Sequence, residues 1–134
     1  MYEIKITYLA EKNGKEKIVK ENLILEHAES FSDAEEIGYE YASGLKAVDV
    51  TDIKRSRIKE VLNARQSQED LIWQAELLDV FHDEDDNETQ LKYKVVLFAP
   101  TFDRAKSFIV EYMKQGYDMT LISIQLTNFL DVLI

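Results

Sequence analysis

Basic residues gather in one short stretch of an otherwise acidic protein. Lys54, Arg55, Arg57 and Lys59 lie within the segment DIKRSRIKE, whereas the chain of 134 residues carries a formal net charge of −10. Lysine and arginine bind phosphates and release counterions, so this cluster has the chemistry of a nucleic-acid contact. In a strand, Arg55 and Arg57 share one face, so a row that follows a phosphate backbone contains only part of the cluster. The favoured interpretation is that these side chains offset neighbouring acids on an exposed strand edge; single-stranded nucleic-acid binding is the alternative.

Aromatic side chains supply the stacking that binds single-stranded nucleic acid, provided that they face solvent. Tyr2, Tyr8, Trp73 and Tyr93 stand in segments where apolar and charged residues alternate. That alternation is typical of strand residues that face a core. We therefore expect these four aromatic residues to face the core and not to form a stacking platform.

An acidic segment, HDEDDNE at residues 82–88, has some features of a calcium-binding loop. Asp83, Asp85 and Asn87 match the first three ligand positions of an EF-hand. Glu88 replaces the glycine that the turn needs, and Lys94 replaces the bidentate glutamate. We therefore predict a solvated hairpin loop and no metal site.

The chain lacks the residue patterns of known catalytic sites. His27 and His82 are the only histidines, there is no cysteine, and the four glycines stand singly, so no phosphate loop is formed. No serine lies in a nucleophile elbow, and the many carboxylates are not diagnostic. We predict that the protein is not an enzyme and has no cofactor.

The composition is that of a globular protein. Hydrophobic residues make up 46% and charged residues 31%, with a single proline. The opening MYEIKITYLAEKNGKEK alternates and does not resemble a signal peptide, and no apolar run approaches membrane-spanning length. We expect a cytoplasmic protein that does not contact a membrane.

The chain contains an internal duplication with an offset of 71 residues. AESFSDAEEIGYEYASG at residues 28–44 corresponds to APTFDRAKSFIVEYMKQG at residues 99–116. In both, apolar residues recur at i, i+3, i+4 and i+7, which predicts one amphipathic helix per repeat. Ser32 and Asp103 are the expected N-caps. Gly44 and Gly116 are the expected left-handed residues that end the helices.

Segments of period two flank each predicted helix. In the first repeat, two such segments are joined by Asn13-Gly14, a strong hairpin signal. In the second repeat, residues 72–81 and 91–97 form the equivalent pair, but the offset of 71 places residues on the wrong face there. The two hairpins must therefore differ by a one-residue insertion or a bulge. A strand follows each helix, so each repeat has the order β-β-α-β.

The predicted fold is α+β, with duplicated β-β-α-β units and two helices packed on an antiparallel or mixed sheet. We expect one pseudo-symmetric domain over residues 1–134, with repeats at 1–63 and 71–134 and a linker at 64–70. Whether the strands form one sheet or two is open. SRIKEVLNAR is also compatible with an amphipathic helix, but a strand is favoured because its counterpart ends in FLDVLI. Formal charge is −2 over residues 1–66 and −8 over residues 67–134.

Three segments resemble a small, uncharacterised domain family that gut anaerobic bacteria and their phages and mobile elements encode. They are YEIKITY, VTDIKRSRIKEV and SIQLTNFLDVL, and the match is strongest over VTDIKR, from Val50 to Arg55. The second repeat departs from the pattern at Gln125 and Leu126, where a charged residue is more typical of the family. The family has no assigned catalytic residues, so the resemblance implies a phage or mobile-element setting and transfers no site.

These observations predict a non-catalytic accessory protein, of phage or mobile-element type, that acts by macromolecular binding. A protein partner is favoured, bound by an acidic surface of the second half or by an exposed sheet edge. One alternative is a single-stranded nucleic-acid-binding protein that uses residues 54–59. Another is a small hydrolase or nucleotide-sequestering protein with a pocket where the repeats meet. Homo-oligomer formation stays open.

Overall fold

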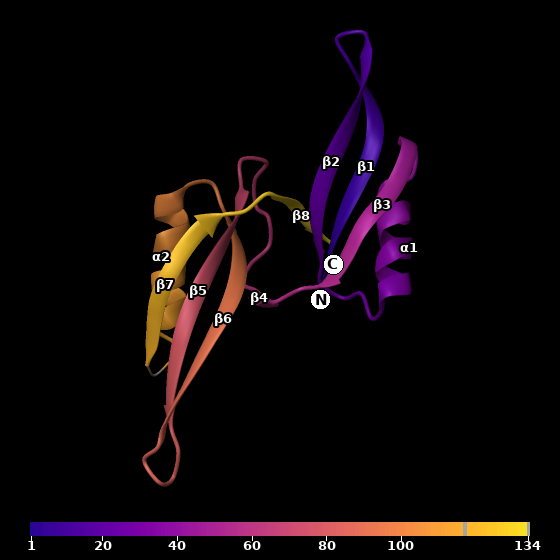
Figure 1. Cartoon of the computed structure of the whole chain (residues 1–134). Helices are drawn as coiled ribbons and strands as arrows, with labels where there is room; N and C mark the ends of the chain where they lie inside the picture. Colours follow the sequence, from indigo (N-terminus) through magenta and orange to yellow (C-terminus); the bar gives the residue numbers. More distant parts are fainter. Residues whose placement is uncertain (117, 134) are drawn as a thin grey trace. The chain divides into compact units, whose positions relative to one another are not determined.

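A computed structural model describes residues 1–116 and 118–133 and divides the chain into two compact units. Unit 1 comprises Met1–Ser56 and Asn128–Ile134, and unit 2 comprises Arg57–Thr127. Each unit has one four-stranded sheet and one helix, which confirms the predicted α+β class (Figure 1). The strands therefore form two sheets.

Unit 1 has the strand order β3-β1-β2-β8. Its elements are β1 (Tyr2–Lys12), β2 (Lys15–Leu25), α1 (Phe31–Tyr41), β3 (Lys46–Arg55) and β8 (Phe129–Leu133). β1 pairs antiparallel with β2 and β3, whereas β8 pairs parallel to β2. Alternate strand residues, among them Ile4, Ile6 and Leu23, are fully buried with Ala34 of α1. Burying this face stabilises the unit by roughly 25 cal/mol for each Å² of apolar surface removed from water.

Unit 2 has the equivalent order β4-β6-β5-β7. Its elements are β4 (Ile58–Val61), β5 (Leu71–His82), β6 (Glu88–Ala99), α2 (Phe102–Met113) and β7 (Met119–Leu126). β5 pairs antiparallel with β6 and β7, and β4 pairs parallel to β6. The core of Ala75, Leu77, Val95 and Leu97 packs with Ile109 of α2. Residues 58–61 are a strand, as favoured over a helix.

The fourth strand of each sheet belongs to the other sequence repeat. β4 follows β3 in the first repeat but pairs with β6 of unit 2, and β8 follows β7 in the second repeat but pairs with β2 of unit 1. Only two residues separate β3 from β4, and two separate β7 from β8. The chain thus exchanges one strand reciprocally between its repeats.

The duplication extends to details of backbone pairing. A shift of register lies between Lys5 and Ile6 in the pairing of β1 with β3, and between Glu76 and Leu77 in the pairing of β5 with β7, at an offset of 71. The hairpins differ as predicted: Tyr2 lies opposite Leu25, 23 residues later, and its counterpart Trp73 lies opposite Leu97, 24 residues later. From this insertion to Leu97, the offset is therefore 72.

The predicted N-caps are wrong by two residues. Ser30 caps α1 and accepts a hydrogen bond from the backbone N of Asp33, and Thr101 caps α2 in the same way. Each cap precedes a phenylalanine whose ring packs edge-on against the first strand: Phe31 contacts Tyr2, and Phe102 contacts Trp73. The helices therefore start one residue after Ser30 and Thr101, whose side chains cap them.

The two helix-terminal glycines have different roles. Gly44 takes the predicted left-handed conformation, with φ of +90°. Gly116 does not, and a Cβ there would lie only 2.6 Å from the Cε of Met119. The prediction is therefore confirmed for Gly44 and wrong for Gly116, where a larger residue would have to displace the flexible side chain of Met119.

The predicted linker is an ordered turn within unit 2. The carboxylate of Asp70, a buried residue, accepts hydrogen bonds from the backbone N of Gln66 and Ser67. Just before the turn, the side-chain amide of Asn63 donates to the Phe98 carbonyl at 2.9 Å and accepts from the Phe98 N at 2.7 Å. Asn63 thereby extends the pairing of β4 with β6 by one side chain.

Replacing Asn63 with alanine should destabilise the protein by about 1–3 kcal/mol, because both backbone groups of Phe98 lose their partner. Urea unfolding monitored by tryptophan fluorescence measures this loss. Gln68→Ala, in the exposed part of the same turn, is the matched control and should stay within about 0.5 kcal/mol of wild type. Equal effects of the two changes would contradict the role assigned to Asn63.

Strand exchange also predicts the behaviour of a nicked chain. A protease site inserted between Ser67 and Gln68, and cut after folding, should give two fragments that stay together, because each contributes a strand to the other's sheet. Size-exclusion chromatography should show one species with the mass of the intact chain, which separates only in denaturant. The uncut insertion variant is the control. Separate elution of the fragments under native conditions would contradict the exchange.

Candidate binding surfaces

The predicted basic cluster is divided between the two units. Lys54 and Arg55 end β3 in unit 1, whereas Arg57 and Lys59 belong to unit 2. Arg55 lines a small hollow with Met1 and Ala28, on a different part of unit 1 from Lys54. The four residues, contiguous in sequence, are therefore not assembled within either unit.

Lys59 is engaged by an aromatic ring in its own unit. Its Nζ lies 4.2 Å from the centre of the Tyr93 ring, a cation–π contact. The aromatic residues are placed as predicted, since Tyr2, Trp73 and Tyr93 are buried and Tyr8 is half-buried. Tyr2, Trp73 and Tyr93 belong to the cores and Tyr8 packs against one, so they do not form an exposed row for stacking bases.

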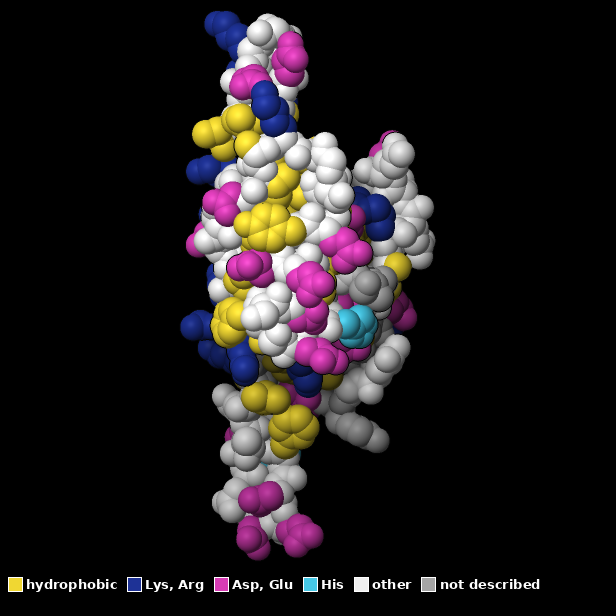
Figure 2. All heavy atoms as spheres, turned by 90° about the vertical axis from the view of Figure 1, so that its right-hand side faces the viewer, with side chains coloured by type: hydrophobic (Ala, Val, Ile, Leu, Met, Phe, Trp, Pro, Cys, Tyr) yellow, Lys and Arg dark blue, Asp and Glu magenta, His cyan; other side chains and the backbone are white. Residues whose placement is uncertain are grey.

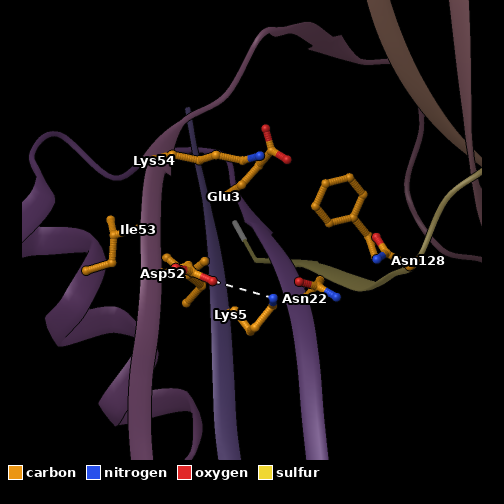
Figure 3. A pocket seen from close by; sticks show the side chains of 9 residues that line it. Glu3, Lys5, Asn22, Asp52, Ile53, Lys54 and Asn128 are labelled. Atoms are coloured by element: carbon orange, nitrogen blue, oxygen red, sulfur yellow. Dashed lines mark ion pairs between the residues drawn. The ribbon is translucent and has the colours of Figure 1, made fainter.

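A hollow in unit 1 lies beside Lys54. It has a volume of about 450 Å³ and is lined by residues from β1, β2, β3 and the start of β8: Glu3, Ile4, Lys5, Asn22, Asp52, Ile53, Lys54, Asn128 and Phe129. The Nζ of Lys5 lies 3.4 Å from an oxygen of Asp52, its partner in register. Lys54 lies opposite Glu3, and its side chain points toward that carboxylate (Figure 3).

The charges of this hollow balance. Two lysines lie opposite two carboxylates on neighbouring strands, and Lys5 and Asp52 form an ion pair. An exposed cross-strand pair of this kind contributes about 0.2–1 kcal/mol to the sheet. The hollow offers hydrogen-bond donors and acceptors, but its lining has no serine, cysteine or histidine that could act as a nucleophile with its base.

Each unit has a cluster of two tyrosines and two carboxylates at equivalent positions. In unit 1 the Tyr8 hydroxyl donates to Glu21 at 2.6 Å, and this hydrogen bond, with burial and the charge of Glu21, raises the pKa of Tyr8 to about 12. Burial, together with the charges of Glu21 and Asp131, also raises the pKa of Tyr41 on α1. Asp131 reaches this cluster on the exchanged strand β8.

The cluster of unit 2 has the same groups with one pair interchanged. Asp79 corresponds to Tyr8, Tyr93 to Glu21, Tyr112 to Tyr41, and Glu60 to Asp131, by the offsets of 71 and 72. Burial, then the neighbouring Tyr112, raises the pKa of Tyr93 to about 12, and burial and the charge of Glu60 raise the pKa of Tyr112. Glu60 also arrives on an exchanged strand, β4. Sequence reasoning missed both clusters, because a single offset does not align them.

Ionisation of Tyr8 in unit 1 makes the stability of the folded protein depend on pH in the alkaline range. Because the folded pKa of Tyr8 is about 12 and the unfolded value about 10, its contribution is complete below pH 10 and is lost as pH rises through 12. We expect Tyr8→Phe to flatten the fall of the urea midpoint between pH 9.5 and 12. Glu21→Gln, which keeps the phenol, should move part of the tyrosinate absorbance titration to lower pH. Profiles identical to wild type would contradict the Tyr8–Glu21 contact.

The acidic segment forms the tip of the β5–β6 hairpin. Asp83 accepts hydrogen bonds from the backbone N of Asp85 and Asn87, and the Asn87 bond is the main cause that lowers the pKa of Asp83. Among the described residues, no three histidine or carboxylate side chains lie close enough to hold a metal ion. The hairpin tips differ in charge: the β1–β2 tip carries both signs, at the top of Figure 2, and the β5–β6 tip is acidic, at the bottom.

The two halves of the sequence differ in net charge, but the two units of the structure do not. Each unit has eight basic and thirteen acidic side chains, a formal net charge of −5, because the exchange carries Arg57, Lys59 and Arg65 into unit 2. Unit 2 is therefore no more acidic than unit 1.

The equivalent edge strands of the two sheets differ in charge. β7 ends its sheet, and residues 119–128 contain no charged side chain. Ile122 and Leu126 on this strand are 44% and 55% exposed. The equivalent segment of the first repeat, residues 48–57, carries five charges: Asp49, Asp52, Lys54, Arg55 and Arg57. The basic residues of the cluster are thus among the charges that keep the edge of β3 from pairing with another strand. The edge of β7 has no such charges.

The two-unit α+β architecture with its exchanged strands is that of a small protein with an internal duplication. The described residues contain no cluster that could hold a metal ion. The chain belongs to a family described as a domain of unknown function, DUF4494, whose model matches residues 1–134. This confirms the expected membership of an uncharacterised domain family. Searches of curated proteins and of solved structures found no match. Neither helix, over its described residues, has the length and apolar character needed to cross a membrane.

Proposed function

We propose that this protein is a non-catalytic accessory protein that binds another protein through the outer edge of β7. One observation carries the proposal: β7 is an uncharged edge strand, whereas its counterpart β3 is charged. Exposed edges of this kind accept a strand from another chain, because their free N–H and C=O groups form a ready template. The bound segment would add a fifth strand to the sheet of unit 2.

The surroundings of β7 suggest the chemistry of the partner. Asp79 pairs with Met119 at the first residue of β7, and the exposed Asp118 precedes it. At the other end, Ile122 and Leu126 present apolar side chains. An extended segment with apolar residues, and with a lysine or arginine beside the two aspartates, complements both features.

The geometry supports protein binding better than the single-stranded nucleic-acid alternative. Lys54 points toward Glu3, and Lys59 contacts the buried Tyr93. These contacts differ from a row of cations beside exposed aromatic faces, which is the arrangement that binds single strands.

A charge placed on the edge tests the proposal. Ile122→Lys should weaken capture of a stoichiometric partner from host lysate by roughly tenfold or more, because the lysine must be desolvated on pairing. Thr51→Lys is the matched control, since Thr51 occupies the equivalent position of β3 and is already beside charged residues. In the purified complex, amide hydrogen exchange should slow in residues 119–126 and not in residues 46–55.

Two outcomes would overturn this assignment. Capture that is lost equally with Thr51→Lys, or unchanged with Ile122→Lys, would remove β7 from the interface. Salt-sensitive binding of a labelled single-stranded oligonucleotide, abolished by Arg55→Glu together with Arg57→Glu, would establish the nucleic-acid alternative instead.

A further inference from the structure

The two exchanged strands share a sequence motif, and the two units pair with it in the same way. Residues 58–62 are Ile-Lys-Glu-Val-Leu, and residues 129–133 are Phe-Leu-Asp-Val-Leu. Both therefore have an apolar residue, a variable residue, an acid, valine and leucine. Both pair parallel to the second hairpin strand, with a register shift at the same place, before Glu60 and before Asp131.

The acceptor groove has matching features in both units. In unit 2, Ile58 is 6% exposed, and Leu62 packs against the core that includes Ile109. In unit 1, Leu133 packs against the corresponding core. The acid of each motif lies near the tyrosine in the last turn of the helix, Glu60 by Tyr112 and Asp131 by Tyr41. Each groove is thus a site for an extended segment with apolar, acidic and Val-Leu positions.

We propose that the groove beside β2 is an exchangeable docking site for a second copy of this chain, which inserts its own β8 and forms a strand-exchanged dimer. The occupant seated there is the chain's own segment, so a second copy supplies the same contacts without any change in the groove. The monomer and the dimer then differ only in the link at Thr127–Asn128, in long-range charge and in association entropy. A link of two residues favours exchange, because a short hinge cannot relax.

This assembly depends on concentration and salt. Intramolecular docking of β8 benefits from a high effective concentration, so the dimer forms when the chain folds at high protein concentration. Each copy carries a net charge of −10, so added salt raises the dimer fraction by screening repulsion. The docking surface is distinct from the outer edge of β7, and the inference does not rest on the proposed function.

Two single-cysteine variants test the exchange, because the natural chain has no cysteine. Asn22 and Phe129 are partners in register between β2 and β8. Asn22→Cys and Phe129→Cys chains are mixed in urea, refolded together at high concentration in 0.3 M salt, and oxidised. Exchange gives a disulfide-linked dimer of the two different chains, identified by mass spectrometry. Gln68→Cys, on an exposed turn, replaces Phe129→Cys in the control and should give several-fold less mixed dimer.

Light scattering of the chain without cysteine gives an independent measurement. The dimer fraction should rise with the refolding concentration and should fall when Gly-Ser-Gly-Ser is inserted between Thr127 and Asn128. It should persist in Ile122→Lys, which separates this contact from pairing at β7. A single-chain mass at every concentration, mixed dimers no more abundant than in the Gln68→Cys control, or a dimer lost in Ile122→Lys and unaffected by the insertion would overturn the proposal.

Discussion

Parallel pairing of an exchanged strand is the interaction on which both units depend. Without β8, the open side of β2 would expose its backbone groups and the fully buried Leu23 and Ile24 would lose their cover. The same holds for β6 and β4 in unit 2. Each helix packs on a sheet whose fourth strand comes from the other repeat, so the two repeats complete each other's sheets.

The secondary structure could be read from the sequence, because local periodicity and turn chemistry determine it. Asn13 and Gly14 take the positive φ angles of a tight hairpin, and the one-residue difference between the hairpins follows from the failed offset. The exchange could not be read, since alternation shows which face of a strand is buried and not which strand lies beside it. The helix starts were missed because each segment offers two candidate N-caps two residues apart, and the caps in the structure are the earlier ones, Ser30 and Thr101.

The candidate sites were harder to predict than the fold. The basic segment, for which nucleic-acid binding was the alternative interpretation, is contiguous in sequence, but the boundary between the units falls inside it, between Ser56 and Arg57. The members of the tyrosine–carboxylate clusters, in contrast, are far apart in sequence. They come together only when the strands pair and the helix packs on the sheet. Tyr8–Glu21 in one unit and Asp79–Tyr93 in the other preserve a phenol and a carboxylate while reversing their strands. Position-by-position comparison of the repeats therefore conceals what they share.

The order in which the strands occur along the chain has a consequence during synthesis on the ribosome. Unit 2 needs only residues 57–127, so all of its strands have been translated before β8 appears. The strands β1, β2 and β3 of unit 1 precede unit 2 in the chain, yet unit 1 stays one strand short until residues 128–133 have emerged. Chains that are translated side by side on one message therefore present open grooves next to newly made β8 segments. Vectorial synthesis thus provides an interval in which pairing within a chain and pairing between neighbours compete.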